Sequence, residues 1–110
     1  MDPTPLREPT FLILTALART PQHGYGIIQD VAGISGGRVH LKAGTLYAAL
    51  ERLTEERLIE VDREAVVDAR LRRYYRITAA GAARLTDEVA RLRQHLRVAA
   101  DRLGLDGLAT

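Results

Sequence analysis

Apolar side chains recur at heptad spacing through the last third of the chain. They are Leu85, Val89, Leu92, Leu96, Ala99 and Leu103, separated by steps of 4, 3, 4, 3 and 4 residues. This spacing predicts a helix over residues 79–103 with one apolar stripe, roughly 37 Å long at 1.5 Å per residue. A body built from 110 residues is too small to cover that stripe. We therefore expect the six residues to contact a second copy of the chain, and packing on the chain's own first helix is the alternative.

A second constraint lies between Lys42 and Thr78. Leu46, Ala49, Leu50 and Leu53 fall on one face of a helix expected over residues 43–57. Two strands are expected after it, at residues 58–61 and 71–78, with residues 63–70 as a charged loop between them. On the strands, the residues predicted to face inward are Ile59, Val61, Leu71, Tyr75 and Ile77. A helix followed by such a hairpin is typical of a winged helix-turn-helix reader of DNA.

The first forty residues supply the rest of a small helical core. One helix is expected from Pro9, which suits a first turn, to Pro21, which ends it. A second helix is expected after Gly24, with Ile27, Val31 and Ile34 inward, and a short strand at residues 39–41. The predicted class is α+β, mostly α. Its parts are a disordered arm (1–8), a winged helix-turn-helix domain (9–78), a dimerisation helix (79–103) and a tail (104–110).

Charge narrows which surface can meet DNA. Net charge is only +2, and the acids Glu51, Glu55 and Glu56 crowd the end of the third helix, where they repel phosphate. The start of that helix has small residues, free backbone N–H groups and the positive end of the dipole. From these features the predicted DNA contacts on the helix are Lys42, Gly44, Thr45, Tyr47, Ala48 and Arg52. An ordinary surface helix is the alternative interpretation.

The hairpin carries a basic cluster of its own. Arg70, Arg72 and Arg73 lie on or beside the expected loop, and arginine suits a narrow minor groove and its phosphates. They complete the predicted DNA contacts. A solvated hairpin of mixed charge is the alternative, because Asp62, Glu64 and Asp68 dilute the cluster.

Other classes of chemistry find little support. The chain has no cysteine, and its three histidines share no metal-ligand spacing, so we expect surface or capping histidines and no metal site. No phosphate-binding loop of Walker or Rossmann type is present, and we expect neither enzymatic activity nor a cofactor. The apolar run at residues 11–17 is too short to span a membrane, and no signal peptide is visible, so a cytoplasmic protein is expected.

Three segments resemble the PadR-like family of bacterial transcriptional regulators. They are His23-Gly24-Tyr25, then Gly44-Thr45-Leu46-Tyr47 with Leu50 and Leu53, and Arg73-Tyr74-Tyr75-Arg76-Ile77-Thr78 with Gly81. The resemblance covers about residues 11–90. It implies a homodimer that binds double-stranded DNA at inverted-repeat operators, usually as a repressor, and that a small apolar or aromatic effector often releases. It also implies that Lys42, Thr45 and Tyr47, with Arg72 and Arg73 of the wing, contact DNA.

The chain departs from the family pattern at several positions. Ala48 stands where proline is common, Gly26 where an acidic residue is common, and the wing tip Asp68-Ala69-Arg70 lacks the usual glycine. In some short relatives a flat aromatic ligand stacks on tryptophan. This chain has no tryptophan. The competing hypothesis is a winged-helix module that binds proteins and does not read DNA, since a fold alone does not fix function.

Overall fold

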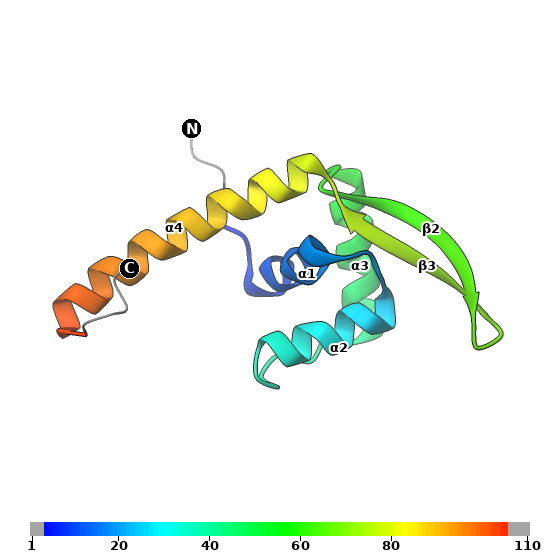
Figure 1. Cartoon of the computed structure of the whole chain (residues 1–110), viewed down its shortest axis with the longest axis horizontal. Helices are drawn as coiled ribbons and strands as arrows, with labels where there is room; N and C mark the ends of the chain where they lie inside the picture. The colour runs from blue at the N-terminus through cyan, green and yellow to red at the C-terminus, as the bar shows by residue number, and fades with distance from the viewer. Residues whose placement is uncertain (1–3, 106–110) are drawn as a thin grey trace.

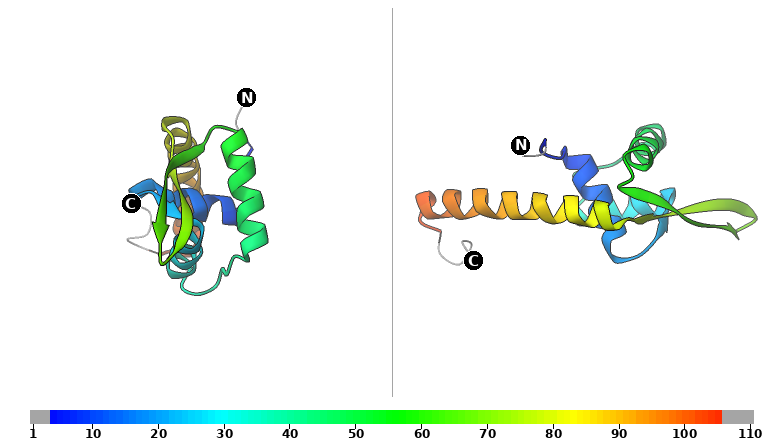
Figure 2. Two further views of the ribbon diagram at one scale, coloured as in Figure 1. Left: turned by 90° about the vertical axis from the view of Figure 1, so that its right-hand side faces the viewer. Right: turned by 90° about the horizontal axis from the view of Figure 1, so that it is seen from above.

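The structure is a computed structural model that describes residues 4–105. A body of three helices carries a long fourth helix, and a β-hairpin projects from the other side of the body (Figures 1 and 2). In chain order the elements are α1 (Glu8–Arg19), β1 (Gln22–His23), α2 (Gly24–Ile34), α3 (Ala43–Glu55), β2 (Ile59–Val67), β3 (Arg70–Ile77) and α4 (Ala79–Leu103). The sheet is antiparallel with strand order β1-β3-β2. This arrangement confirms the predicted class.

The core lies where α1, α2 and α3 meet the base of the hairpin. Its fully buried side chains are Ile13, Leu14, Leu17, Ile27, Val31, Leu46, Leu50, Leu53 and Ile59. Helix α1 begins with Glu8 and Pro9 in its first turn, where a negative charge and a missing N–H are both favourable. Thr20 is extended because the next residue is Pro21, and α1 ends there as expected.

The segment after α2 differs from the prediction. Ile34, expected in the core, is 44% exposed because α2 ends at this residue and the chain turns away through Gly36 and Gly37. Residues 39–41 form no strand. Leu41 is buried and Val39 packs against the core, so the alternation of apolar residues here reflects burial without strand pairing.

The hairpin is longer than the sequence suggested. Residues 63–67 and Arg70 belong to its strands, and only Asp68 and Ala69 form the turn, with φ of 52° and 62°. Positive φ at both central residues is the type I′ geometry that matches strand twist. Val61 and Leu71, expected to face inward, are 42% and 69% exposed. Leu71 lies near the tip of the hairpin, beyond the core, and Val61 lies beside an irregularity in the pairing of β2, where the alternation is broken.

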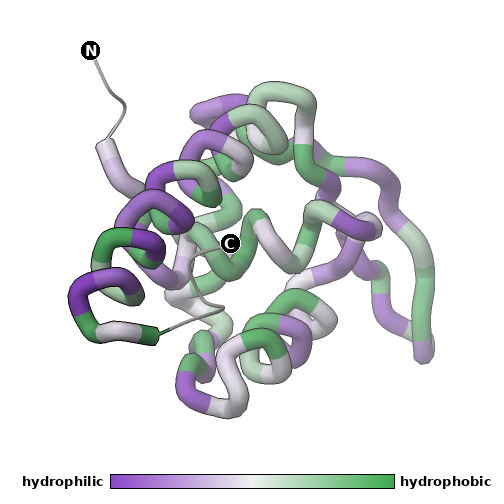
Figure 3. Tube along the Cα trace, turned by 60° about the vertical axis from the view of Figure 1, so that its left-hand side comes forward, coloured by the Kyte–Doolittle hydropathy of each residue, from purple (hydrophilic) through white to green (hydrophobic). Residues whose placement is uncertain are grey.

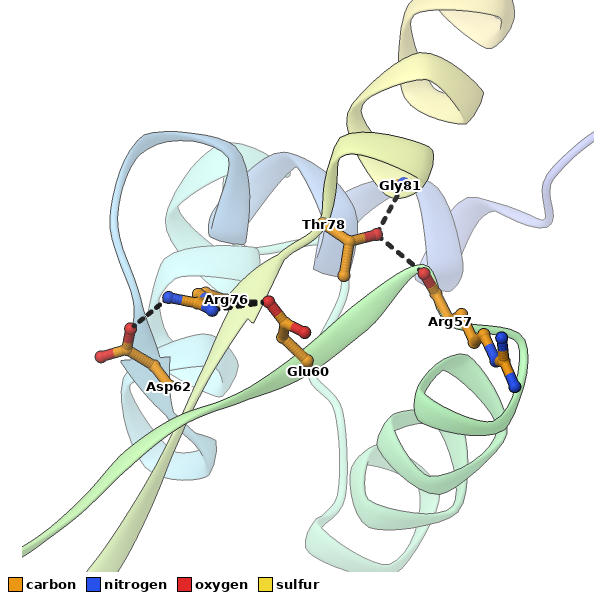
Figure 4. Close-up of polar contacts among 6 residues, drawn as sticks. All are labelled: Arg57, Glu60, Asp62, Arg76, Thr78 and Gly81. Carbon is orange, nitrogen blue, oxygen red and sulfur yellow. Dashed lines mark hydrogen bonds and ion pairs between the residues drawn. The ribbon is translucent and has the colours of Figure 1, made fainter.

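A bulge bends the hairpin where it leaves the body. The register shifts by one residue between Val61 and Arg63, so Asp62 is the extra residue in β2. The Arg76 guanidinium spans the bulge, lying 2.7 Å from a Glu60 carboxylate oxygen and 3.4 Å from one of Asp62 (Figure 4). The bulge therefore sets the direction in which the outer part of the hairpin leaves the body. The ion pairs of Arg76 stabilise the base of the hairpin.

The N-terminal end of the described chain is tied to the body. The arm was expected to be disordered through residue 8, but Glu8 opens α1 and Leu6 packs against the core. The backbone carbonyl of Thr4 accepts a hydrogen bond from Arg84. Helix α3 ends at Glu55, two residues before the expected Arg57, and α4 ends at Leu103 with Gly104 as its C-cap. Residues 1–3 of the arm and 106–110 of the tail lie outside the described residues.

Candidate nucleic-acid interface

Tyr47 lies at the centre of a surface that joins the start of α3 to the wing. Its side chain is 52% exposed, and its ring lies against Gly24: a carbon added to Gly24 would be 2.5 Å from the Tyr47 hydroxyl. Glycine at this position thus lets α2 and α3 approach closely. A hollow of about 370 Å³ opens here. Its lining residues are His23, Gly24, Tyr47, Glu64, Arg70, Leu71, Arg72, Arg73 and Tyr75.

A second hollow extends the same surface toward the start of α3. It measures about 380 Å³ and is lined by Tyr25, Ile28, Ala43, Tyr47, Arg70 and Arg72. Tyr47, Arg70 and Arg72 border both hollows. The fold therefore brings the N-terminal turn of α3 and two arginines of the wing, far apart in the sequence, onto one face.

The first turn of α3 offers unpaired donors. Lys42 occupies the N-cap without a side-chain cap bond, and no acid lies in the first turn. Lys42, Ala43, Gly44, Thr45 and Ala48 are all exposed. The opening N–H groups of a helix have no partner within it, and the helix dipole adds partial positive charge. This end of α3 can accept a phosphate and leaves room for a base edge beside its small side chains.

Arg52 stands apart from this surface. Its guanidinium donates to the Thr10 hydroxyl of α1 at 2.9 Å and lies 4.0 Å from the Glu56 carboxylate. Glu51 and Glu55 border a different hollow, on the side of Tyr47 that faces Val61. This hollow adjoins the first one, because Tyr47, Arg73 and Tyr75 line both, but neither Arg70 nor Arg72 lines it.

The wing arginines differ in how their charge is balanced. Arg73 lies 3.5 Å from the Glu64 carboxylate, and Arg63 lies 4.0 Å above the Tyr74 ring and 2.8 Å from Asp62. Within residues 4–105, neither Arg70 nor Arg72 forms an ion pair, and Arg72 Nε is buried without a hydrogen-bond partner. Arg70 and Arg72 are therefore uncompensated charges on the wing side of this surface.

His23 supports the same surface from behind. Its Nδ1 accepts a hydrogen bond from the Gly26 N–H at 3.1 Å and caps α2, and its ring meets Tyr74 edge-on at 5.2 Å. Burial, and next the charge of Arg72, hold the pKa of His23 below its usual value. A surface or capping role was predicted for each histidine. Its strand pairing with Tyr74 was not predicted, because a two-residue strand leaves no periodicity to detect.

Tyr25 is a second lining residue that sequence reasoning passed over. It is 55% exposed and borders the hollow beside Ala43. The available signal was an aromatic side chain between two glycines at a helix start, which is an unusual place for a core residue.

The apolar stripe of α4 divides into a covered part and a free part. Leu85 packs against the core, and the buried Glu88 carboxylate pairs with Arg91 and accepts from the Leu6 backbone. The hydrogen bond from Arg91 is the main reason why the pKa of Glu88 is lowered. Further along, the exposed seam residues are Val89, Leu92, Leu96, Ala99 and Leu103. Figure 3 shows hydrophobic positions recurring along this free length.

Other kinds of site are not evident in the described part of the chain. No group of three His, Asp or Glu side chains among residues 4–105 could hold a metal ion. None of the helices described is both long and apolar enough to cross a membrane. The fold and the basic surface together define a winged helix-turn-helix protein.

Comparison with known proteins identifies the family. Residues 13–87 match the model of the transcriptional regulator PadR-like family. The Transcriptional regulator Rv3488 of Mycobacterium tuberculosis is 42% identical over 76 residues, which cover 69% of this chain and 67% of that protein. The chain belongs to the PadR-like family. It is accordingly a DNA-binding transcription regulator and not an enzyme.

Solved structures agree with this assignment. A PadR family transcription regulator from Clostridium difficile superposes with a TM-score of 0.74 at 25% identity, covering 88% of this chain and 99% of that one. Bacillus subtilis PadR, solved in complex with operator DNA, gives a TM-score of 0.67 at 25% identity. That match covers 76% of this chain and 47% of the longer relative.

Proposed function

We propose that this protein is a homodimeric repressor that acts in the cytoplasm on an inverted-repeat operator. One observation carries the DNA-binding face: the uncapped start of α3, Tyr47 and the unpaired Arg70 and Arg72 share one continuous surface. A solved relative is described as a complex with operator DNA, which supports reading this surface as the contact with a duplex.

The proposed contacts divide between two grooves. The start of α3 enters the major groove, where small side chains allow close approach and free N–H groups meet phosphate. The contributing residues are Lys42, Gly44, Thr45, Tyr47 and Ala48. The wing lies over the adjacent minor groove with Arg70 and Arg72 inward and Arg73 at the margin. Arg52 is left out of the proposed contacts, because its guanidinium is held by Thr10 of α1.

The free length of α4 is the proposed dimer interface. Leu92, Leu96 and Leu103 are 41%, 48% and 71% exposed in the single chain. Three large apolar side chains on one stripe are costly in water, at about 25 cal/mol for each Å² of apolar surface. A two-fold dimer through this stripe would present two α3 helices to the two halves of an inverted repeat.

A small apolar or aromatic effector is part of the proposal. A hollow of about 270 Å³ lies between α1 and α4, lined by Leu6, Glu8, Phe11, Leu12, Glu88 and Leu92. A ligand in it would touch the seam at Leu92 and so alter the placement of α4. Release of DNA by such a ligand is the expected consequence.

A mobility shift with DNA from the protein's own promoter region tests the proposal. We expect a discrete shifted band whose affinity falls steeply as salt rises, because phosphate contacts release counterions. A protein that shifts no fragment of that region at low salt would favour the alternative of a protein-binding winged-helix module.

A further inference from the structure

Helix α4 meets the end of α3 in a tight joint built around Thr78 (Figure 4). The Thr78 hydroxyl donates to the Arg57 carbonyl at 2.7 Å and accepts from the Gly81 N–H at 3.0 Å. The Thr78 backbone N–H donates to the Leu58 carbonyl at 3.0 Å. One residue therefore caps α4 and fastens it to the turn that follows α3.

Gly81 allows the first turn of α4 to pack directly against the backbone at this joint. A carbon added at Gly81 would lie 2.0 Å from the Leu58 carbonyl oxygen and 2.8 Å from Ile77 Cγ1. The first turn of α4 thus rests on the backbone itself, where no side chain fits. Arg57 adopts a φ of 62° in the same turn. This positive φ, the hydrogen bond from the Thr78 N–H and the close approach of Gly81 therefore all occur at the turn formed by Arg57 and Leu58.

The base of the wing is fastened next to the joint. Arg76, two residues before Thr78, holds Glu60 and Asp62 across the bulge. The end of α3, the base of the wing and the start of α4 therefore meet in space around Leu58. A rotation at this point, which the contacts of Leu85 with the core and of Glu88 with Leu6 also oppose, moves α3 and the wing together relative to α4.

Because α3 is long, a small rotation at the joint displaces its N-terminal end by about the rise of one base pair. Helix α3 has 13 residues, so its free end lies roughly 20 Å from the joint at 1.5 Å per residue. A rotation of about 10° at the joint moves that end by roughly 3.4 Å, which is the rise of one base pair. The angle set by the joint is therefore fine enough to choose between neighbouring half-site spacings.

We infer that Thr78 and Gly81 are positioning residues for operator recognition: they fix the angle between α4 and α3, and thereby the half-site spacing that the dimer accepts. This inference rests on the proposed dimer and its proposed operator. Neither residue lies on the DNA-binding surface, so their effect passes through α3.

The experiment measures affinity for operators whose half-sites are moved together or apart by one and two base pairs, and for a single half-site. Thr78→Val keeps the side-chain shape and removes both hydroxyl bonds. Thr78→Asp keeps the cap on α4 and removes only the bond donated to the Arg57 carbonyl, so it serves where Thr78→Val does not fold. Thr78→Ser retains the hydroxyl. Thr86→Val is the matched control, because its hydroxyl bonds the Ala82 carbonyl within α4, away from the joint.

The unaltered protein, Thr78→Ser and Thr86→Val should prefer the native spacing by about tenfold or more over a one-base-pair change. In Thr78→Val and Thr78→Asp, this preference should fall to about threefold or less, while single half-site affinity stays within about twofold. Gly81→Ala, which forces the joint open, should shift the preferred spacing. Unchanged spacing preference in a folded, dimeric Thr78→Val or Thr78→Asp protein would overturn the inference. Failure of the unaltered protein to bind any of these DNAs would instead overturn the proposed function on which it rests.

Discussion

Ala69 occupies a backbone conformation that alanine disfavours. It is the second residue of the wing turn, with φ of 62°, where glycine is the residue that type I′ turns prefer. An L-residue in the left-handed region costs roughly 1–2 kcal/mol. Glycine would avoid this cost, but its greater freedom in the unfolded chain would offset part of the gain in stability. The wing tip therefore holds a small, removable strain.

Ala69→Gly should raise the free energy of unfolding by about 0.5–1 kcal/mol, because the strain relieved exceeds the added entropy of the unfolded chain. Urea denaturation measures the change. Ala65→Gly is the control: it also replaces alanine with glycine in the hairpin, but at a strand position without positive φ, so it should destabilise. A destabilised Ala69→Gly protein would contradict the turn geometry.

His23 makes stability depend on pH. Its pKa is lowered in the fold, by burial and then by Arg72, relative to the usual 6.5. Folding thus favours the neutral ring, whose Nδ1 accepts the Gly26 N–H. The stabilisation of the fold by neutral His23 is complete above about pH 6.5. It is lost as the pH falls from there through the lower pKa of the folded state.

Urea denaturation between pH 8 and pH 5 should show this loss. In His23→Asn, which keeps a capping side chain without a titrating ring, the drop in stability toward acid pH should be smaller. His40 and His95 are present in both proteins, so their contributions cancel from the comparison. Parallel pH profiles would show that His23 is not the titrating group.

At the scale of the elements, the wing arginines should contribute unequally to DNA binding. Arg72→Ala should weaken operator affinity and reduce the salt slope by about one, the value for one lost phosphate contact. Arg73→Ala should have a smaller effect, because Arg73 already shares its charge with Glu64. Fluorescence anisotropy over a range of salt concentrations gives both quantities.

Arg93→Ala is the matched control for this comparison. It removes the same charge from an exposed position on α4, far along the chain from the wing. Its salt slope should equal that of the unaltered protein. An Arg72→Ala protein with unchanged affinity and slope would remove the wing from the proposed interface.

The elements also show what the sequence could and could not predict. Helix periodicity predicted α1, α3 and α4 well, because burial on one face repeats over several turns. The length of the hairpin was missed because its outer strands are charged and its turn uses Asp68-Ala69 without glycine. The alternation of residues in β3 predicted that Leu71 faces inward, but Leu71 lies on the part of the hairpin beyond the core and is exposed.

The surface proposed to bind DNA was predicted in part. Charge along α3 separated its basic start from its acidic end, and Arg70 and Arg72 line hollows with Tyr47, whereas Arg73 also lines the hollow beside Glu51 and Glu55. Arg52 was predicted on the same surface because it is exposed and basic. Its bond to Thr10, 42 residues earlier, is a tertiary contact that no local pattern encodes.

For the whole molecule, the proposed dimer is open to a direct test. Leu96→Glu places a charge in the middle of the free stripe of α4, where burial against a partner would be strongly unfavourable. We expect the mass in solution, measured by light scattering after size exclusion, to fall to that of one chain. Operator affinity should fall with it, since only one half-site is then held.

Gln94→Glu adds the same charge to α4 off the seam and should leave the dimer intact. Both variants introduce one glutamate, on the seam in one case and off it in the other. A Leu96→Glu protein that keeps its oligomeric mass would mean that the stripe does not form the interface.

The central claim is that paired α3 helices read a two-fold symmetric DNA site. Selection from random double-stranded oligonucleotides tests it most directly. We predict enrichment of an inverted repeat whose half-site centres lie about one helical turn, roughly 10 base pairs, apart. Recovery of no common motif, even at low salt, would contradict the claim.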